Sequence, residues 1–417
     1  MRIKDKIEFL CGADEGYIGK MNCWQAVAPF SEQYCDFLAA VSEEIMNDLE
    51  AREFPDVVTF GFFCRRANLQ RMKKEYEERT VVRQVSPVSP GGPYRLGRGV
   101  TFHIAPSNVP INFAYSMAAA LLAGNCCIVR ASSKPFRQVD IVCRCMAAVM
   151  DRKEFVWASL VVSIVRYGHD KEVTDYLSSL CDVRVIWGGD NTIAEIRKSP
   201  LPPRSTEITF ADRYSMAVIS SAAILREDNM ERLARDFYND TYLYDQNACS
   251  SPRLIYWLGN REDTEAAKEK FWGAVHEFVK GRYELAPVVA VEKYMTACRA
   301  ALDIVSFRPR VVLGEDNLIG RIEAGCLKMS IIDYRCPGGS FFEYSSEKID
   351  DLQHIARSRT VQTVAYYGDL KDMIREFSIK CGFFGVDRIV PIGKTADFSL
   401  VWDGHDLILD MSRIVGY

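Results

Sequence analysis

The segment at residues 245–252 carries the side chain with the greatest potential for chemistry. It reads Asp-Gln-Asn-Ala-Cys-Ser-Ser-Pro, and Cys249 lies between a helix predicted over 227–242 and a strand predicted over 253–257. A thiolate is a strong nucleophile, but it forms only where positive potential or helix amides stabilise it. Cys249 is therefore a candidate for covalent catalysis, with an inert buried thiol as the alternative.

A second candidate is Asn108, in the segment Ala-Pro-Ser-Asn-Val-Pro at 105–110. It follows a strand predicted over 101–105 and precedes a helix predicted over 109–123. Its side-chain amide could donate to a developing oxyanion at the end of the strand. It could equally cap the following helix, and the two roles are compatible.

Two further segments have residue types that suit a dinucleotide. Gly188 and Gly189 follow a strand predicted over 183–187, where small residues let a phosphate approach backbone amides, although a plain turn has the same composition. Arg130, Ser132 and Ser133 end a strand predicted over 126–131. In a doubly wound domain that position faces the adenosine ribose, and cations with hydroxyls suit a 2′-phosphate. A solvated basic turn is the alternative reading of these three residues.

Metal chemistry is not predicted. The chain has 14 cysteines and 5 histidines, but it contains no Cys-x-x-Cys pair and its histidines are scattered. Zinc sites need ligands paired at turn or helix spacing, so we expect no bound metal.

The elements that must position these residues alternate between short apolar runs and longer amphipathic ones. Strands are predicted at 101–105, 126–131, 160–165, 183–187 and 214–219, with helices at 109–123, 136–150, 171–180 and 192–198 between them. Such alternation predicts a parallel sheet covered on both faces, with ligands at the carboxyl ends of its strands. A second α/β pattern follows, with strands at 253–257, 340–344, 363–367 and 388–392. We therefore predict a cofactor-binding domain over 1–220, a catalytic domain over 221–395 and a C-terminal return segment over 396–417.

Bulk composition excludes several classes of partner. Of 417 residues, 48% are hydrophobic, and 52 basic against 56 acidic side chains give a net charge of -4. This balance favours neither nucleic acid nor an acidic membrane surface as partner. The first six residues lack the apolar run of a signal peptide, and the apolar stretch at 113–123 is shorter than a membrane span of about 20 residues. A cytoplasmic protein with reduced thiols is expected.

Together these segments resemble the aldehyde dehydrogenase superfamily, and more closely its LuxC-type acyl-CoA reductase branch. The similarity runs from about residue 95 to 415, and it is carried by the segments 97–110, 130–133, 213–219, 245–252, 387–393 and 402–404. It implies that 213–219 is the last strand of the cofactor domain. It also implies a hairpin at about 80–103 for homo-oligomerisation. Cys249 would be the acyl-accepting nucleophile, Asn108 an oxyanion donor and NADPH the cofactor, with NADH as the alternative.

Two departures from the superfamily pattern bear on the outcome of the reaction. Hydrolytic members carry a glutamate in a Glu-Leu-Gly-Gly context, whereas the matching stretch here begins with Phe210. The Glu-x-Phe-Gly-Pro motif of the nicotinamide ribose is replaced by residues near Gly339 to Glu343. The resemblance therefore implies reduction of a fatty acyl thioester to an aldehyde, with an acyl-activating or acyl-transferring protein as a further partner. An oxidising aldehyde dehydrogenase and an acyl-carrying scaffold without hydride transfer are the alternatives.

Overall fold

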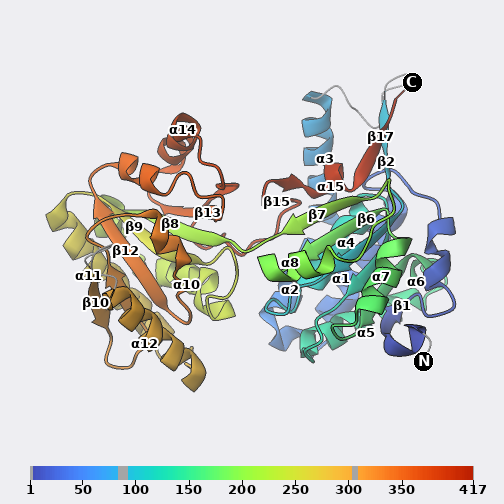
Figure 1. Ribbon diagram of the computed structural model, residues 1–417, viewed down its shortest axis with the longest axis horizontal. Coiled ribbons are helices and arrows are strands. Elements are labelled where there is room, and N and C mark those ends of the chain that lie inside the picture. The colour runs from blue at the N-terminus through green and yellow to red at the C-terminus, as the bar shows by residue number, and fades with distance from the viewer. Residues whose placement is uncertain (1–2, 83–92, 303–308, 417) are drawn as a thin grey trace. The chain divides into compact units, whose positions relative to one another are not determined.

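The chain folds into two compact units, each built on its own sheet. The computed structural model describes residues 3–82, 93–302 and 309–416 (Figure 1). Unit 1 comprises Met1–Ala211 and His405–Tyr417, and unit 2 comprises Asp212–Gly404. Unit 2 therefore interrupts the chain of unit 1.

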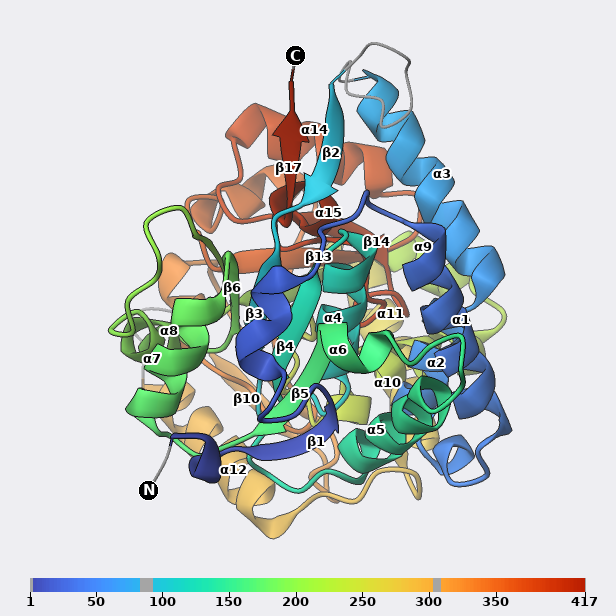
Figure 2. The same cartoon turned by 90° about the vertical axis from the view of Figure 1, so that its right-hand side faces the viewer.

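Unit 1 contains a six-stranded sheet with the order β1-β5-β4-β3-β6-β7. Its strands are β1 (Glu8–Gly12), β3 (Val100–Ile104), β4 (Cys126–Arg130), β5 (Val162–Arg166), β6 (Val183–Trp187) and β7 (Thr206–Phe210). All pair in parallel except β1, which adds antiparallel to β5. The helices following these strands are α4 (Asn112–Leu122), α5 (Arg137–Met150), α6 (Ala158–Val161), α7 (Lys171–Leu180) and α8 (Asp190–Ile196). Figure 2 shows β3, β4 and β5 side by side within this unit.

The burial pattern explains why these segments form a covered parallel sheet. Every residue of β3 and of β6 is buried, as expected for strands with helices on both faces. Helix α5 buries Val139, Val142, Met146 and Val149, which recur at helical spacing on one face. Helix α7 begins at Asp170, whose side chain accepts a hydrogen bond from the Val173 amide at 3.1 Å. The predicted parallel α/β sheet is thus confirmed. Most predicted ends of its strands and helices lie within two or three residues of the observed ends.

The described residues up to 82 form three helices, three 3₁₀ turns and one strand. Helices α1 (Glu32–Asn47), α2 (Pro55–Phe63) and α3 (Arg66–Val82) are joined by short turns, and 3₁₀ turns lie at Ile3–Lys6, Ile18–Cys23 and Ala51–Glu53. Strand β1 was not predicted from sequence, because it is a short edge strand whose residues Glu8 and Gly12 are polar or unfavourable for strands. Strand β7 was also missed.

The hairpin expected at about 80–103 falls partly on residues that the structure does not describe. Residues 83–92 lie outside the described residues, and β2 (Tyr94–Gly97) pairs antiparallel with the C-terminal strand β17 (Ser412–Val415). Strand β3 instead enters the centre of the six-stranded sheet. Arg95 fixes the β2–β17 ribbon, because its Nε donates to the Ser412 hydroxyl at 2.8 Å. The described partner of β2 thus comes from more than 300 residues away. The expected hairpin, which includes residues 83–92, and its role in oligomerisation stay predictions. The turn helix α15 (Leu407–Asp410) and β16 (His405–Asp406) complete this part of unit 1.

Unit 2 contains a seven-stranded sheet with the order β10-β11-β12-β9-β8-β13-β14. Its strands are β8 (Tyr214–Ser220), β9 (Pro252–Leu258), β10 (Arg310–Leu313), β11 (Gly320–Glu323), β12 (Ser340–Ser346), β13 (Val361–Tyr367) and β14 (Arg388–Pro391). Only β10 runs antiparallel to its neighbour. The helices are α9 (Ser221–Arg226), α10 (Met230–Asp240), α11 (Arg261–Val279), α12 (Pro287–Leu302) and α14 (Lys371–Cys381), with 3₁₀ turns at Tyr242–Tyr244, Met329–Asp333 and Ile349–His354 and the short strand β15 (Val401–Trp402).

Alternate residues of the unit 2 strands feed two separate cores. On one face, Ile255 and Trp257 of β9 pack in a cluster with Phe237 of α10 and Phe271 of α11. On the other face, Leu254 and Tyr256 join a cluster that includes Ile374 and Phe377 of α14. This period of two is the signature of a strand buried between two helical layers.

Strand β8 corrects one expectation about the sheets. The segment 213–219 was expected to be the last strand of the cofactor domain, but β8 lies between β9 and β13 in the unit 2 sheet. The predicted domain boundary at 220/221 therefore falls inside unit 2. The apolar run of β8 could not by itself show whether the segment is an outer strand of the first sheet or a central strand of the second.

Candidate active site

The loop carrying Cys249 has an unusual backbone path. It follows the 3₁₀ turn Tyr242–Tyr244 and precedes β9, and two successive residues, Asp245 and Gln246, have φ values of 51° and 58°. Such values are uncommon for residues with a Cβ and persist only where the surroundings hold them. The loop is therefore held in a defined shape by tertiary contacts.

The Gln246 side chain supplies most of those contacts. It is 1% exposed, and its Nε2 donates to the Pro252 and Ser340 carbonyls, each at 2.9 Å. Its Oε1 accepts from the amides of Gly339 and Ser340 at 3.0 and 3.2 Å. One amide thus ties the Cys249 loop to the start of β12, and a buried polar group with every bond satisfied specifies a single arrangement.

Three arginines set the electrostatics of the Cys249 thiol. Burial raises its pKa to about 11, and Asp403 adds to this rise, whereas Arg253, Arg388 and Arg213 lower it. The group is consequently a thiol at neutral pH in this arrangement. The arginines act in the direction that a nucleophile requires, because a cation stabilises the thiolate that forms during attack.

Arg253 also belongs to the framework of the loop. It is 7% exposed, and its Nη2 donates to the Gln246 carbonyl at 3.0 Å. Its Nε finds no hydrogen-bond partner among the described residues. Ser215 of β8 holds the other side of the loop, since its hydroxyl donates to the Cys249 carbonyl at 2.7 Å. The roles of Gln246 and Arg253 were not found from sequence, because nothing in the spacing reveals which groups a loop residue contacts.

In unit 1, the candidate cofactor residues gather where parallel-sheet ligands bind. The chain runs from β3 to β4 and β5 on one side of β3, and to β6 and β7 on the other. The carboxyl ends of β3 and β6 thus flank a topological switch point, the usual binding crevice of an open α/β sheet. Asn108 follows β3, and Gly188 and Gly189 follow β6. The sheet therefore brings these segments to one edge.

Asn108 does not cap helix α4. The helix begins at Asn112 with Ile111 as its N-cap residue, three residues later in the chain than the expected cap at Asn108. The Asn108 side chain is exposed, in a bend after β3. Of its two expected roles, the cap is wrong, and the oxyanion role stays a prediction.

The end of β4 is more constrained than a solvated turn. The Arg130 guanidinium lies 4.7 Å from the Tyr167 ring centroid and donates to the carbonyls of Tyr167 and Gly168 at 3.2 and 3.3 Å. Ser132 is buried and its hydroxyl accepts from the Lys134 amide at 3.1 Å, whereas Ser133 is exposed. Arg130 thus already has a structural role in joining the ends of β4 and β5.

The Gly188–Gly189 turn is determined by packing and by a strand bond. A Cβ added to Gly188 would lie 3.0 Å from Cγ2 of Thr192, and the Gly188 amide donates to the Phe210 carbonyl at 3.1 Å. Gly189 is the N-cap residue of α8, and Asp190 places a carboxylate in the first turn. That negative charge opposes an anion at the same position.

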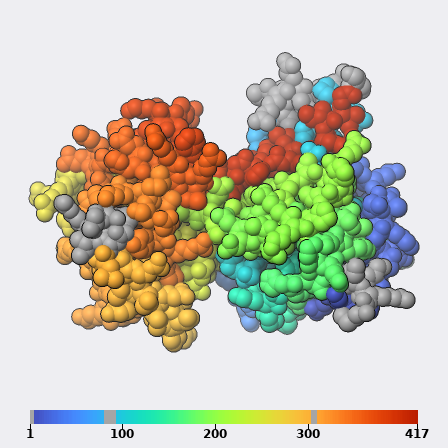
Figure 3. Space-filling view, in the orientation of Figure 1, coloured from blue at the N-terminus to red at the C-terminus, as the bar shows by residue number. Residues whose placement is uncertain are grey.

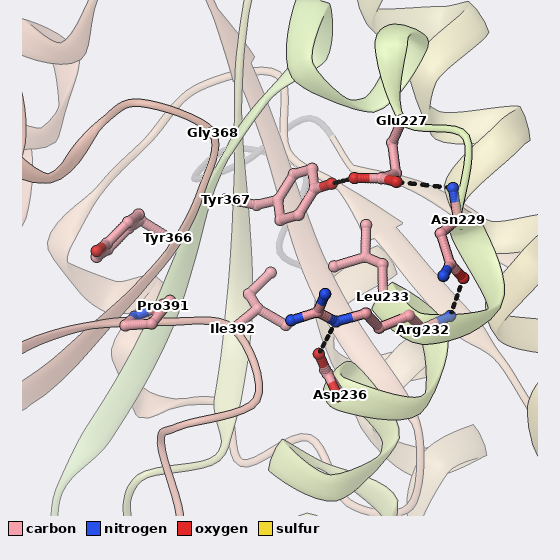
Figure 4. Close-up of a pocket in the computed structure, with 10 residues that line it drawn as sticks. All are labelled: Glu227, Asn229, Arg232, Leu233, Asp236, Tyr366, Tyr367, Gly368, Pro391 and Ile392. Carbon is pink, nitrogen blue, oxygen red and sulfur yellow. Dashed lines mark hydrogen bonds and ion pairs between the residues drawn. The ribbon is translucent and has the colours of Figure 1, made fainter.

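A pocket of about 370 Å³ lies elsewhere in unit 2 (Figure 4). Its lining comes from the carboxyl ends of β13 and β14 and the start of α10, including Glu227, Arg232, Tyr367 and Ile392. Cys249 lies just before the amino end of β9. Strand β9 is parallel to β8, and β8 is parallel to β13. A seven-residue strand is about 23 Å long, so the pocket and the cysteine lie at opposite edges of the sheet. Glu227 accepts hydrogen bonds from the Tyr367 hydroxyl and from the Asn229 amide. Because the pocket lies at the opposite edge of the sheet from Cys249, it does not contribute to the thiol chemistry.

Comparison with known proteins decides the family. Residues 29–289, more than half of the chain, match the family described as acyl-CoA reductase (LuxC). The chain belongs to the LuxC family. A long-chain acyl-protein thioester reductase of Vibrio harveyi is 26% identical over 77% of this chain and 64% of the relative. Another of the same name, from Photorhabdus laumondii, is 27% identical over 77% of this chain and 63% of the relative. The chain thus spans a little under two thirds of the length of these relatives.

Solved structures agree on an aldehyde-dehydrogenase fold for this LuxC-family chain. A benzaldehyde dehydrogenase of Corynebacterium glutamicum superimposes with a TM-score of 0.62 at 14% identity, covering 99% of this chain and 95% of that one. Lactaldehyde dehydrogenase of Escherichia coli gives a TM-score of 0.62 at 13% identity, covering 96% and 88%. The expected fold class is therefore confirmed.

The superfamily resemblance matches Phe210 to the position of a water-activating glutamate. It is 5% exposed and stacks on Trp187, with ring centroids 3.7 Å apart, and the His405 ring packs against its edge at 5.5 Å. Trp187 in turn donates from Nε1 to the Ser116 hydroxyl at 2.9 Å. An aromatic stack at the ends of β6 and β7 offers no carboxylate to deprotonate water.

Glu343 does not act as a ribose ligand in this LuxC-family chain. It is fully buried in β12, where Oε1 accepts from the indole nitrogens of Trp257 and Trp272 at 2.8 and 2.7 Å. Its Oε2 accepts from Arg321 Nε at 2.7 Å. The carboxylate is thus saturated inside the unit 2 core, and its role is structural.

The described residues offer neither a cluster of metal ligands nor a membrane-spanning helix. Residues 3–82, 93–302 and 309–416 contain no group of three or more His, Cys, Asp or Glu side chains arranged to hold a metal ion. None of the helices described in these ranges is long and apolar enough to cross a membrane.

Proposed function

We propose that this chain reduces a fatty acyl thioester to the aldehyde through an acyl-enzyme on Cys249, with a reduced nicotinamide dinucleotide as cofactor. The observation that carries the proposal is the Cys249 loop of a LuxC-family chain, fixed by the buried Gln246 amide and placed among three arginines. The names of the relatives support a long-chain acyl group carried on a protein as the donor. Acyl-coenzyme A presents the same thioester.

The proposal places the dinucleotide at the switch point of unit 1, although the Asp190 carboxylate beside the Gly188–Gly189 turn would oppose a pyrophosphate there. The turn at Gly188 and Gly189 would adjoin the pyrophosphate, and Ser132, Ser133 and Arg130 would lie at the adenosine ribose. The cations and hydroxyls there favour NADPH over NADH. When bound, the cofactor supplies the hydride, and the protein supplies position and electrostatics.

Cys249 carries the covalent part of the reaction. Its Sγ attacks the thioester carbon and forms a C–S bond, the carbonyl electrons move to oxygen, and the thiol proton is transferred to the carrier sulfur as that group leaves. Arg253 and Arg388 stabilise the negative charge of the attacking sulfur. The Cys249 amide and Asn108 would donate to the oxyanion. When the carbonyl re-forms, the bond to the carrier sulfur breaks and the carrier leaves as its thiol. The acyl group held on Cys249 would accept the hydride together with a proton from solvent, and its release as aldehyde would restore the Cys249 thiol.

The Phe210 stack supports aldehyde rather than acid as the product. A hydrolytic outcome needs a base that deprotonates water, and the position expected for that base is aromatic. Excluding water protects a thioester until hydride arrives. The acyl-enzyme should therefore proceed to aldehyde or return to a thiol.

Acyl-thioester-dependent oxidation of NADPH and NADH, measured across acyl chain lengths, tests the proposal. The wild type should consume NADPH and yield one aldehyde per cofactor, and Cys249→Ala should lose both labelled acyl-enzyme and aldehyde. Cys381→Ala, which removes another half-buried thiol of unit 2, is the matched control and should retain both. Acid as the product would favour an oxidising dehydrogenase, and acylation without any cofactor binding at millimolar levels would favour a scaffold. Aldehyde formation by Cys249→Ala would overturn the proposal.

A further inference from the structure

Helix α12 of unit 2 presents a row of apolar side chains to solvent. Val288, Val291 and Met295 are 65%, 62% and 55% exposed, and Leu302 at the end of the helix is 84% exposed. Cys298, half-buried, completes the row. Isolated exposed apolar residues are ordinary, but a contiguous row along a helix indicates a surface that another element covers.

The opposite face of α12 is firmly attached to unit 2. Ala297 and Ala300 are buried, and so is Lys293, whose ammonium donates to the carbonyls of Gly338 at 2.8 Å and Leu318 at 3.3 Å. Because these contacts fix the rotation of the helix, the apolar row cannot turn inward. In Figure 3 the gold surface of α12 lies on the visible face of unit 2.

The spacing of the row is that of a helix-pairing seam. Positions 288, 291, 295, 298 and 302 alternate steps of three and four residues, which is the a/d pattern of two successive heptads. The helix Pro287–Leu302 is about 24 Å long, enough for two such heptads. A seam of this kind fits another helix rather than a small ligand.

Charges beside the seam match a two-fold arrangement. With Val288 at position a, Glu292 and Arg299 both occupy position e, and both are exposed. In an antiparallel pair, e positions face one another across the interface. If Met295 lies opposite Cys298 of a second copy, and Val291 opposite its Leu302, then Glu292 lies beside its Arg299. The same register places Tyr294, which is 61% exposed, over the small side chain of Ala301 in the second copy.

We propose that α12 is a homodimer interface, at which two copies of this chain pair their α12 helices antiparallel about a two-fold axis. The occupant is a second copy because, when the helix meets itself reversed in this register, unlike charges lie beside each other and the large Tyr294 side chain faces the small Ala301. Symmetry then forms each Glu292–Arg299 pair twice, as in other isologous interfaces. This interface is separate from the β2–β17 ribbon of unit 1 and is independent of the proposed reaction.

A charge exchange tests the register directly. Glu292→Arg places arginine beside Arg299 of the second copy, and Arg299→Glu places glutamate beside its Glu292, so each single variant should lose pairing through α12. Within one chain these positions are seven residues, or about 10 Å, apart, too far for a direct contact. The double variant should recover the wild-type mass in light scattering after gel filtration. An equimolar mixture of the two single variants should form heterodimers, because both cross pairs are then opposite in charge.

Removal of the apolar seam gives the second test. Val291→Asp together with Met295→Asp should halve the mass of the wild-type oligomer at about 1 to 100 µM protein, the range of ordinary interface affinities. Val156→Asp, at a residue of unit 1 that is 52% exposed, is the matched control and should leave the mass unchanged. Circular dichroism should show all variants folded. The proposal is overturned if the wild type is monomeric or if the Val291/Met295 variant keeps the mass of the wild type. It is also overturned if the seam is needed only for binding a different protein.

Discussion

The loop around Cys249 in unit 2 and the loops at the switch point of unit 1 are built in opposite ways. The first is held by a buried amide with four hydrogen bonds, by Arg253 and by Ser215. The second set places Asn108 and Ser133 at the exposed surface. The difference indicates that the loop of the proposed nucleophile is preorganised, whereas Asn108 and Ser133 on the proposed cofactor side can adjust to a ligand. Substitutions should therefore reduce stability and thiol reactivity in unit 2, but mainly cofactor affinity in unit 1.

Gln246→Ala should give the largest effect. The substitution leaves the amides of Gly339 and Ser340 and the Pro252 carbonyl buried without their partner, at a cost of about 1–3 kcal/mol for each such group. Because the losses of neighbouring hydrogen bonds are not additive, we expect the free energy of unfolding of unit 2 to fall by about 3 kcal/mol. The urea midpoint followed by tryptophan fluorescence measures this loss, since Trp257 and Trp272 lie in the unit 2 core.

A glutamine of unit 1 provides the matched control for Gln246. Gln138 makes one long bond, 3.4 Å from its Nε2 to Asp56, and Gln138→Ala should shift stability by less than about 0.5 kcal/mol. Gln246→Glu keeps the acceptor but loses both donated bonds, so its loss should be intermediate. Equal effects of Gln246→Ala and Gln138→Ala would contradict a preorganised nucleophile loop.

Phe210→Glu should change the product. A carboxylate at this position restores the water base of hydrolytic aldehyde dehydrogenases, and general-base catalysis contributes about 10²- to 10⁴-fold. Because the Trp187 and His405 rings surround the position, the pKa of the new carboxyl should be raised and only part of that factor realised, so we expect about tenfold faster release of acid. Chromatographic separation of acid from aldehyde checks this, with Phe210→Leu as the control. If Phe210→Leu releases as much acid, aromatic bulk and not the missing base determines the outcome.

The pH dependence of Cys249 alkylation should follow its surroundings. With a pKa of about 11, the thiolate fraction rises about tenfold per pH unit between pH 7 and 10, and the rate of labelling by iodoacetamide should rise with it. Asp403→Asn removes a carboxylate that raises the pKa and should speed labelling at pH 8. Arg253→Gln removes a cation that lowers the pKa and should slow it. Peptide mass spectrometry isolates Cys249 from the other thiols, and shifts in the same direction for both variants would contradict the electrostatic account.

Local patterns in the sequence predicted the elements of both sheets better than their partners. The burial periodicity of β3, β6 and α7 is local, and those segments were located within one residue. The pairing of β2 with β17, and of β8 with β9 and β13, depends on contacts between distant segments. Edge strands such as β1 lack the continuous apolar run that identifies a central strand.

In the candidate site, too, the residues whose roles depend on tertiary contacts could not be predicted from the local sequence. Cys249 was predicted through the family resemblance, because the residues beside it in the sequence show no feature that would activate the thiol. Gln246 and Arg253 act through bonds to backbone groups up to 94 residues away. Asn108 was expected to cap a helix that begins several residues later, since Pro110 permits a start that the structure does not use.

The smallest effect is expected at Arg130, where the structural and cofactor roles compete. Its guanidinium already donates to the Tyr167 and Gly168 carbonyls, so a 2′-phosphate would share it rather than gain an unengaged cation. Arg130→Gln should therefore raise the Kd for NADPH only about threefold, within the range of an exposed ion pair, and leave the Kd for NADH unchanged. Lys134→Gln, at a neighbouring exposed cation, is the control for general charge. Titration by fluorescence quenching measures both constants. An equal rise for NADPH and NADH would mean that Arg130 acts by joining β4 to β5, and the specificity for NADPH would then have to reside in Ser132 and Ser133.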